Sequence, residues 1–221
     1  MRSRMRPCAT LVTSALLFAP GCVSLLPGSG PLAVKEYAIT ADPGVEPLLP
    51  PRRPSRLRVA LLDTDGLFQR TEFLLRGQDD PSSVRYLAAA RWADFPSRLV
   101  TECLREQLRL SEGIGEILPH NVAGSQDAIL RGRLVRFEGL ESKSSWKAHL
   151  VLDLSIDMGE GERSVPLPRV DVTVDCSEPT PAALARALSL AVTRGTEEAL
   201  PPLRVILGST DDRLPRTAPD S

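Results

Sequence analysis

The stretch WKAHLVLDLSIDM, residues 146–158, alternates between two kinds of side chain. Apolar residues occupy every second position from Ala148 to Ile156, and His149 and Asp153 are among the polar residues between them. Successive side chains of a β-strand point to opposite faces of a sheet. The pattern therefore predicts a long strand with one face in the core and the other in water.

A second alternating stretch follows closely. RVDVTVDC, residues 169–176, places valine at every second position, and GEGE at 159–162 has the composition of a turn. We therefore predict that the two alternating stretches pair as a hairpin. The same reading predicts further strands at 34–40, 56–63, 71–76, 84–92 and 128–139.

Two helices are expected among these strands. Asp94 and Pro96 mark the start of the first, which ends near Gly113 and has an apolar stripe with charged residues opposite it. Thr180 and Pro181 supply the start of the second. The fold class expected is α+β, with a mostly antiparallel sheet and two amphipathic helices packed on one face.

The N-terminus has the pattern of an export signal. Arginines at 2, 4 and 6 precede an apolar run from Ala9 to Ala19, which is too short to span a bilayer. The run leads into Ala-Pro-Gly-Cys ending at Cys22, which resembles the lipobox of bacterial lipoproteins. The resemblance implies cleavage before Cys22 and a covalent diacylglycerol on its thiol, with palmitate among the expected acyl chains; the alternative is an ordinary exported cysteine.

This pattern divides the chain into four parts. They are a signal peptide at 1–21, a lipidated tether at 22–33, one α+β domain at 34–207 and a disordered tail at 208–221. Val23 is not the aspartate that retains such lipoproteins in the inner membrane, so the resemblance implies an outer-membrane anchor facing the periplasm.

Composition argues against several classes of function. A net charge of −1 and a pI near 6.2 give no general attraction to nucleic acid. Cys103 and Cys176 could form a disulfide in the oxidising periplasm, or each could act as a small hydrophobic residue on an apolar face.

The sequence offers no clear catalytic or metal-binding pattern. His120 and His149 have no partner nearby in the sequence that would suggest a catalytic or metal site. DTDG at 63–66 lacks the later acidic residues of a calcium loop and is expected to be a turn. We therefore expect no enzyme activity, no metal site and no cofactor other than the lipid on Cys22.

One further stretch carries a family resemblance. VRYLAAARWADFPSRLVTECLREQL, from residue 84 onward, contains Tyr86, Arg91 and Trp92, followed by Pro96 at the start of a helix. With Tyr37, Arg76 and ILRGRLVRFE around it in order, the chain resembles the ABC-type transport auxiliary lipoprotein family, whose members accompany MCE-type lipid transport systems.

The resemblance implies a non-catalytic periplasmic domain that docks an MCE-domain protein, with an ABC permease and ATPase as indirect partners. Tyr86, Arg91, Trp92 and Pro96 would then either anchor the corner between strand and helix or contact that partner. Two other functions are weighed beside this one: a carrier that encloses a lipid or small ligand, and a structural lipoprotein that assembles an envelope complex by pairing sheet edges.

Overall fold

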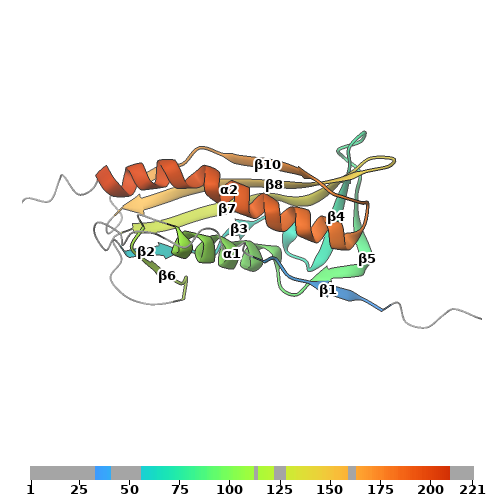
Figure 1. The fold of residues 1–221 in the computed structure, drawn as a ribbon, viewed down its shortest axis with the longest axis horizontal. Helices are drawn as coiled ribbons and strands as arrows, with labels where there is room; N and C mark the ends of the chain where they lie inside the picture. The colour runs from blue at the N-terminus through green and yellow to red at the C-terminus, as the bar shows by residue number, and fades with distance from the viewer. Residues whose placement is uncertain (1–32, 41–55, 112–113, 122–127, 159–162, 210–221) are drawn as a thin grey trace, which may run out of the picture. The chain divides into compact units, whose positions relative to one another are not determined.

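The structure, a computed structural model, describes residues 33–40, 56–111, 114–121, 128–158 and 163–209 (Figure 1). The expected signal peptide, Cys22, the turn at 159–162 and residues 210–221 lie outside the described residues. No helix in the described part is long and apolar enough to cross a membrane.

Ten strands, one short 3₁₀ helix and two α-helices make up the described chain. In order they are β1 (Lys35–Tyr37), β2 (Arg56–Val59), β3 (Asp63–Thr64), η1 (Gly66–Phe68), β4 (Glu72–Gly77), β5 (Val84–Trp92), α1 (Pro96–Leu110), β6 (Glu116–Leu118), β7 (Ala128–Glu141), β8 (Trp146–Met158), β9 (Arg163–Pro166), β10 (Val170–Asp175) and α2 (Pro181–Ser209).

The alternating stretch at 146–158 forms β8, the strand on which the sheet is built. β8 pairs antiparallel with β7 along its whole length, and on its other edge it pairs with β9 and β10. Val170 lies opposite Leu152 and Val174 opposite Ala148, so the predicted pairing of the two alternating stretches is confirmed.

The sheet is mixed, which corrects the expectation of a mostly antiparallel one. Strands β2, β3 and β4 lie one after another along the second edge of β7, and each is parallel to it. β1 is also parallel to β5, and β2 to β6. Parallel neighbours need a crossover connection, and the segment that contains α1 provides it between β4 and β7. Alternation in a sequence reports which face is buried and carries no information on the direction of the neighbouring strand.

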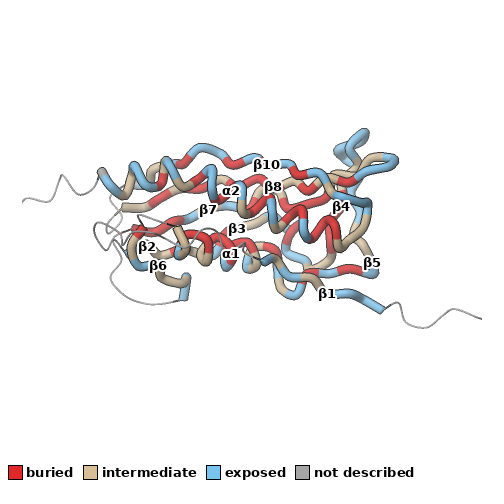
Figure 2. Tube along the Cα trace, in the orientation of Figure 1, coloured by how far each residue is buried: buried red, intermediate tan, exposed pale blue. Residues whose placement is uncertain are grey.

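Both helices cover the same face of the sheet (Figures 1 and 2). Between helices and sheet lies one buried core. Thr180 caps α2 as predicted, because its Oγ1 accepts a hydrogen bond from the Ala183 N–H at 3.3 Å. A Cβ at Gly195 would lie 2.8 Å from Cγ1 of Val170, so glycine lets α2 approach β10 closely.

Three local expectations need correction. The DTDG segment begins as strand β3 beside β7 and continues into η1, so it is more than a turn. No strand was expected between the first helix and residue 128, but β6 lies there and pairs with β2. The second helix runs through Gly208 to Ser209 and enters the segment assigned to the tail.

Candidate functional site

Trp92 is the buried centre of the family motif. Only 3% of it is exposed, and it stacks on Phe73 with ring centroids 4.0 Å apart. Phe137 lies 5.1 Å from Trp92, and Tyr37 lies 5.2 Å from Phe73, again between ring centroids. This row of four rings joins strands β1, β4, β5 and β7, so Trp92 holds together strands that are far apart in sequence.

Arg91 points to the solvent side and pairs with a residue of the first strand. Its Nε donates to Oε1 of Glu36 at 3.0 Å, and its Nη2 bonds the same oxygen. About half of each side chain is exposed. Glu36 lies directly opposite Arg91 in the register of β1 and β5. The sequence offered no signal for this partner, because 55 positions separate the two residues.

Tyr86 and Pro96 lie on either side of Arg91 and Trp92, Tyr86 within β5 and Pro96 at the start of α1. The Tyr86 hydroxyl donates to the Leu67 carbonyl at 3.1 Å, and the Arg70 guanidinium lies 4.7 Å from the centre of its ring. Pro96 is buried at the first position of α1, where its fixed φ suits a helix start and no backbone donor is lost. We call the four residues Tyr86, Arg91, Trp92 and Pro96 the motif corner.

A buried ion pair lies on the opposite face of the sheet from the helices. Glu138 is 1% exposed and accepts two hydrogen bonds from Arg76, at 2.7 and 2.9 Å. Nε of Arg136 lies 3.5 Å from Oε1 of Glu138, and Arg76 also donates to the Pro81 carbonyl. Arg76 therefore fastens the turn between β4 and β5 to strand β7. Its partner Glu138 was not predicted, although a glutamate within a mostly apolar strand stretch is a usable signal.

Both cysteines of the domain are free thiols in the structure, so the Cys103–Cys176 disulfide is absent from it. Cys103 lies in the core, and burial raises the pKa of its thiol to about 11, with a contribution from nearby Glu106. Burial also raises the pKa of Cys176, which is half-buried. Neither thiol has the lowered pKa of a nucleophile.

The two histidines lie apart and in different settings. Nε2 of His149 is 3.0 Å from Oδ1 of Asp171, and its buried Nδ1 has no hydrogen-bond partner within the described chain. Nδ1 of His120 is 3.9 Å from Glu102. In the described ranges no three His, Cys, Asp or Glu side chains gather in a way that could hold a metal ion.

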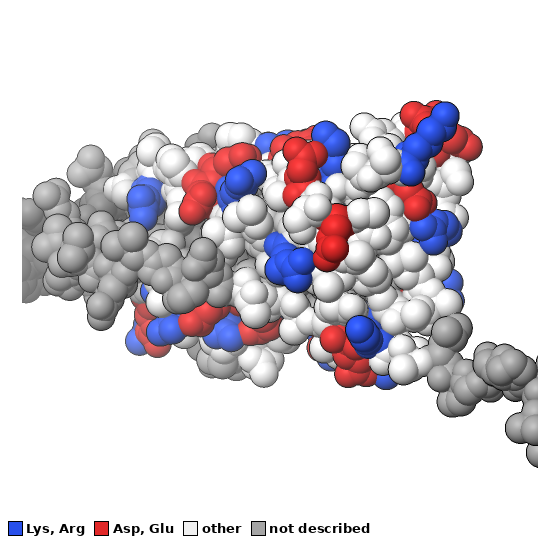
Figure 3. All heavy atoms as spheres, turned by 45° about the vertical axis from the view of Figure 1, so that its right-hand side comes forward, with Lys and Arg blue, Asp and Glu red and all other residues white. Residues whose placement is uncertain are grey.

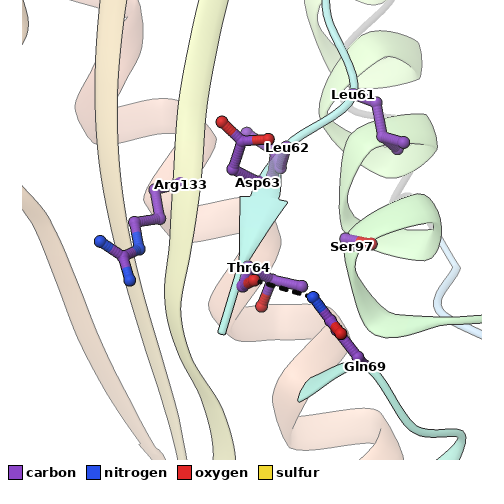
Figure 4. A pocket seen from close by; sticks show the side chains of 7 residues that line it. All are labelled: Leu61, Leu62, Asp63, Thr64, Gln69, Ser97 and Arg133. Carbon is purple, nitrogen blue, oxygen red and sulfur yellow. Dashed lines mark hydrogen bonds between the residues drawn. The ribbon is translucent and has the colours of Figure 1, made fainter. Parts of the chain in front are cut away.

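A shallow cavity of about 530 Å³ lies between β3, α1 and β7 (Figure 4). Five of its seven lining residues are polar, and the set is Leu61, Leu62, Asp63, Thr64, Gln69, Ser97 and Arg133. In the same figure Gln69 bonds the Thr64 carbonyl, at 3.3 Å. Leu61 and Leu62 are the aliphatic residues among the described ones that line it, which is too few to enclose an acyl chain.

Acidic and basic side chains are interspersed on the face shown in Figure 3, where neither sign forms a broad patch. Across the sheet many arginines are matched with acids, as in Arg169 with Asp153 at 2.7 Å and Arg85 with Glu141 at 2.6 Å. On this face the described residues offer no continuous positive track for a phosphate backbone.

Two solved structures have a similar fold. A crystal structure of protein XCC0632 from Xanthomonas campestris, a DUF330 protein, matches with a TM-score of 0.67 and 21% identity, covering 81% of this chain and 100% of that one. The crystal structure of an uncharacterized protein matches with a TM-score of 0.59 and 10% identity, covering 77% of this chain and 99% of the other. At these identities the likeness shows the fold alone.

A search of curated proteins gives no match. The family model described as "ABC-type transport auxiliary lipoprotein component" matches residues 51–199. That span runs from the residues before β2 to the second half of α2, and it includes the whole motif corner and the Arg76–Glu138 pair. The chain therefore belongs to the ABC-type transport auxiliary lipoprotein family.

Proposed function

We propose that this protein is a non-catalytic docking component of an MCE-type ABC lipid transport system, anchored by a lipid on Cys22 to the outer membrane and facing the periplasm. The observation that carries the proposal is the family match over residues 51–199, combined with a cysteine in a lipobox-like setting. The chain would place and bind an MCE-domain protein, while the partner ATPase supplies the energy.

The geometry of the domain favours docking over transport of a ligand by this chain itself. A lipid carrier needs an enclosed apolar cavity. In the described residues the space between helices and sheet is filled by core side chains, and the cavity at Asp63 and Arg133 is shallow and is lined by five polar residues and two leucines. Phospholipid is therefore assigned to the partner system, and this chain supplies protein surface.

One observation supports assembly by edge pairing as a second candidate. β10 ends the described sheet beside β8, and its register with β8 is regular over six residues. The Cys176 N–H bonds the carbonyl of Trp146, directly opposite it. Hydrogen-bonded pairs alternate along an antiparallel ladder, so the N–H groups of Asp171, Thr173 and Asp175 face away from β8, where an added strand could bond them.

Affinity purification from detergent-solubilised membranes tests the main proposal. Tagged full-length wild type is compared with Cys22→Ala, which keeps the whole domain and removes only the lipidation site. We expect the wild type to fractionate with the outer membrane and to recover an MCE-domain protein together with its permease and ATPase. We expect Cys22→Ala to lose the membrane fractionation.

Two outcomes would count against the proposal. Recovery of membrane-anchored wild type without an MCE-domain protein, but with non-covalent lipid in the extract, would favour the carrier. Recovery of assemblies that disappear in Thr173→Pro, a change that spares the bonds to β8, would favour edge pairing.

A further inference from the structure

The first strand of the domain is attached far more lightly than the rest of the sheet. β1 has three residues, and among the described strands it pairs with β5 alone, at one end of the strand order. Its first two residues are exposed and the third, Tyr37, is half-buried. β8, by contrast, has thirteen residues and neighbours on both edges.

Two side-chain contacts hold β1 in place, and Arg91 of the motif corner makes one of them. Arg91 pairs with Glu36, and Tyr37 lies against Phe73 in the aromatic row that Trp92 continues. Beyond the strand, the Ala93 N–H bonds the Tyr37 carbonyl at 2.8 Å, and the Thr40 N–H reaches Oγ of Ser189 at 3.4 Å. Arg91 and Glu36 are half exposed, so their pair is a weak contact.

The attachment of β1 determines how many residues lie between Cys22 and the sheet. With β1 bound, twelve residues separate Cys22 from the sheet, and their fully extended length is about 40 Å. With β1 detached, the next described strand of the sheet is β2, which begins at Arg56 and pairs there with Glu116 of β6. Thirty-three residues then separate Arg56 from Cys22, and the maximum length rises to about 110 Å.

We propose that β1 is a releasable clasp, closed by Arg91–Glu36 and Tyr37–Phe73, that sets how far the domain can extend from its membrane anchor. A closed clasp keeps the domain near the anchor, and an open one lets it reach a partner deeper in the periplasm. Local opening at a strand with so few contacts is expected at much lower cost than global unfolding. The effect on reach rests on the proposed lipidation of Cys22, whereas the opening itself does not.

Hydrogen exchange on the full-length protein in detergent tests the clasp. Arg91→Glu places a carboxylate opposite Glu36 of β1 and also opposite Glu72 of β4, and we expect exchange at residues 34–40 to accelerate about five- to tenfold. Exchange should return toward the wild-type rate in Arg91→Glu/Glu36→Arg, where the pair is rebuilt in reverse. Arg85→Glu is the matched control, because Arg85 is on the same strand, is similarly exposed and pairs instead with Glu141.

Trypsin gives a second measurement. The sequence has no lysine or arginine between Cys22 and Lys35, so cleavage after Lys35 reports access to β1 itself. We expect the peptide that begins at Glu36 to appear several-fold faster in Arg91→Glu than in Arg85→Glu. Glu36→Gln removes the carboxylate of the same pair from β1, and it replaces Arg91→Glu if that variant does not fold.

Three results would overturn the clasp. In the first, exchange at residues 34–40 is unchanged in both Arg91→Glu and Glu36→Gln. In the second, Arg85→Glu accelerates it equally. In the third, β1 in the wild type exchanges as slowly as β8. Each result is valid only if the amides of β8 stay protected from exchange, which shows that the domain is folded. None of the three depends on lipid at Cys22, so they can be told apart from a failure to recover an MCE-domain protein.

Discussion

Trp92 and Arg91 are neighbours in the chain, but their environments differ sharply. Trp92 is 3% exposed and touches two aromatic rings, whereas the Arg91 side chain is 51% exposed. Replacing Trp92 with Ala is expected to lower the free energy of unfolding by about 3–5 kcal/mol, because it empties the centre of the row. Arg91→Ala is expected to cost about 1 kcal/mol or less. Urea titration followed by circular dichroism measures both, and equal losses would contradict this division.

Glu138 and Glu141 form a matched pair of carboxylates on one strand. Both accept two bonds from an arginine, but Glu138 is 1% exposed while the Glu141 side chain is 32% exposed. Glu138→Ala leaves Arg76 with its charge partly buried and unpaired, so we expect a loss of about 3–5 kcal/mol. Glu141→Ala is expected to cost about 1 kcal/mol or less. Thermal unfolding of the two variants should therefore differ clearly, and similar midpoints would argue against the buried pair.

The Cys103 thiol is expected to resist alkylation. Its pKa near 11 leaves almost no thiolate at pH 8, and its sulfur lies in the core. Iodoacetamide labelling of the native protein, read by peptide mass spectrometry, should modify Cys176 before Cys103. Recovery of the two residues as a disulfide-linked peptide from cells would show that they pair in the cell, in conflict with the free thiols of the structure.

At the scale of elements, glycines decide how closely strands and helices approach. A Cβ on Gly132 of β7 would lie 2.8 Å from the backbone oxygen of Asp153 and 2.5 Å from Cδ2 of Leu154. Gly132→Ala is therefore expected to destabilise the protein by about 1–3 kcal/mol through overpacking. Gly66 has no atom within 4 Å of the corresponding position, so Gly66→Ala serves as the control. Equal unfolding midpoints for the two variants would contradict the close packing of β7 on β8.

Elements with a strong periodic pattern could be predicted from sequence, and elements fixed by distant partners could not. Alternation around Leu150 and Val172 predicted β8, β10 and their pairing, because a half-buried strand requires that pattern. β6 was missed because three residues carry no period. The parallel direction of β4 on β7 depends on the crossover through α1, which alternation does not encode.

In the candidate site, too, the motif residues could be predicted from sequence and their partners could not. The sequence singled out Tyr86, Arg91 and Trp92 as a motif. Their partners Leu67, Glu36 and Phe73 follow only from the folded arrangement, since the hydrogen bonds of Tyr86 and Arg91 span 19 and 55 positions. Burial of Trp92 and the pairing of Arg91 favour a structural role for these two residues over direct contact with a partner.

At the scale of the whole molecule, charge pairing predicts loss of stability in acid. Arg169 holds the pKa of Asp153 below its ordinary value, and Arg85 does the same for Glu141. A carboxyl whose pKa is lowered by folding stabilises the folded state at pH values above the ordinary pKa of that group. The contribution is lost as the pH falls through the lowered pKa of the folded state. The unfolding midpoint should therefore fall as pH drops below 4.5 and 3.8, the ordinary values of the two groups.

A variant isolates the contribution of one pair. Arg169→Gln removes the partner of Asp153 and should flatten the decline in the acid range while leaving the midpoint near pH 7 only slightly lower. Thermal scans at several pH values measure this, and an acid decline unchanged in Arg169→Gln would assign it to other groups.

Cross-linking in intact cells tests the docking role most directly, because it captures partners while the membranes are in place. Tagged full-length protein is treated with formaldehyde in cells, purified under denaturing conditions and examined by mass spectrometry, beside Cys22→Ala. The proposed function predicts a covalent adduct with an MCE-domain protein that is present in the wild type and greatly reduced in Cys22→Ala. A membrane-anchored wild type whose adducts contain only other copies of itself or unrelated envelope proteins would contradict it.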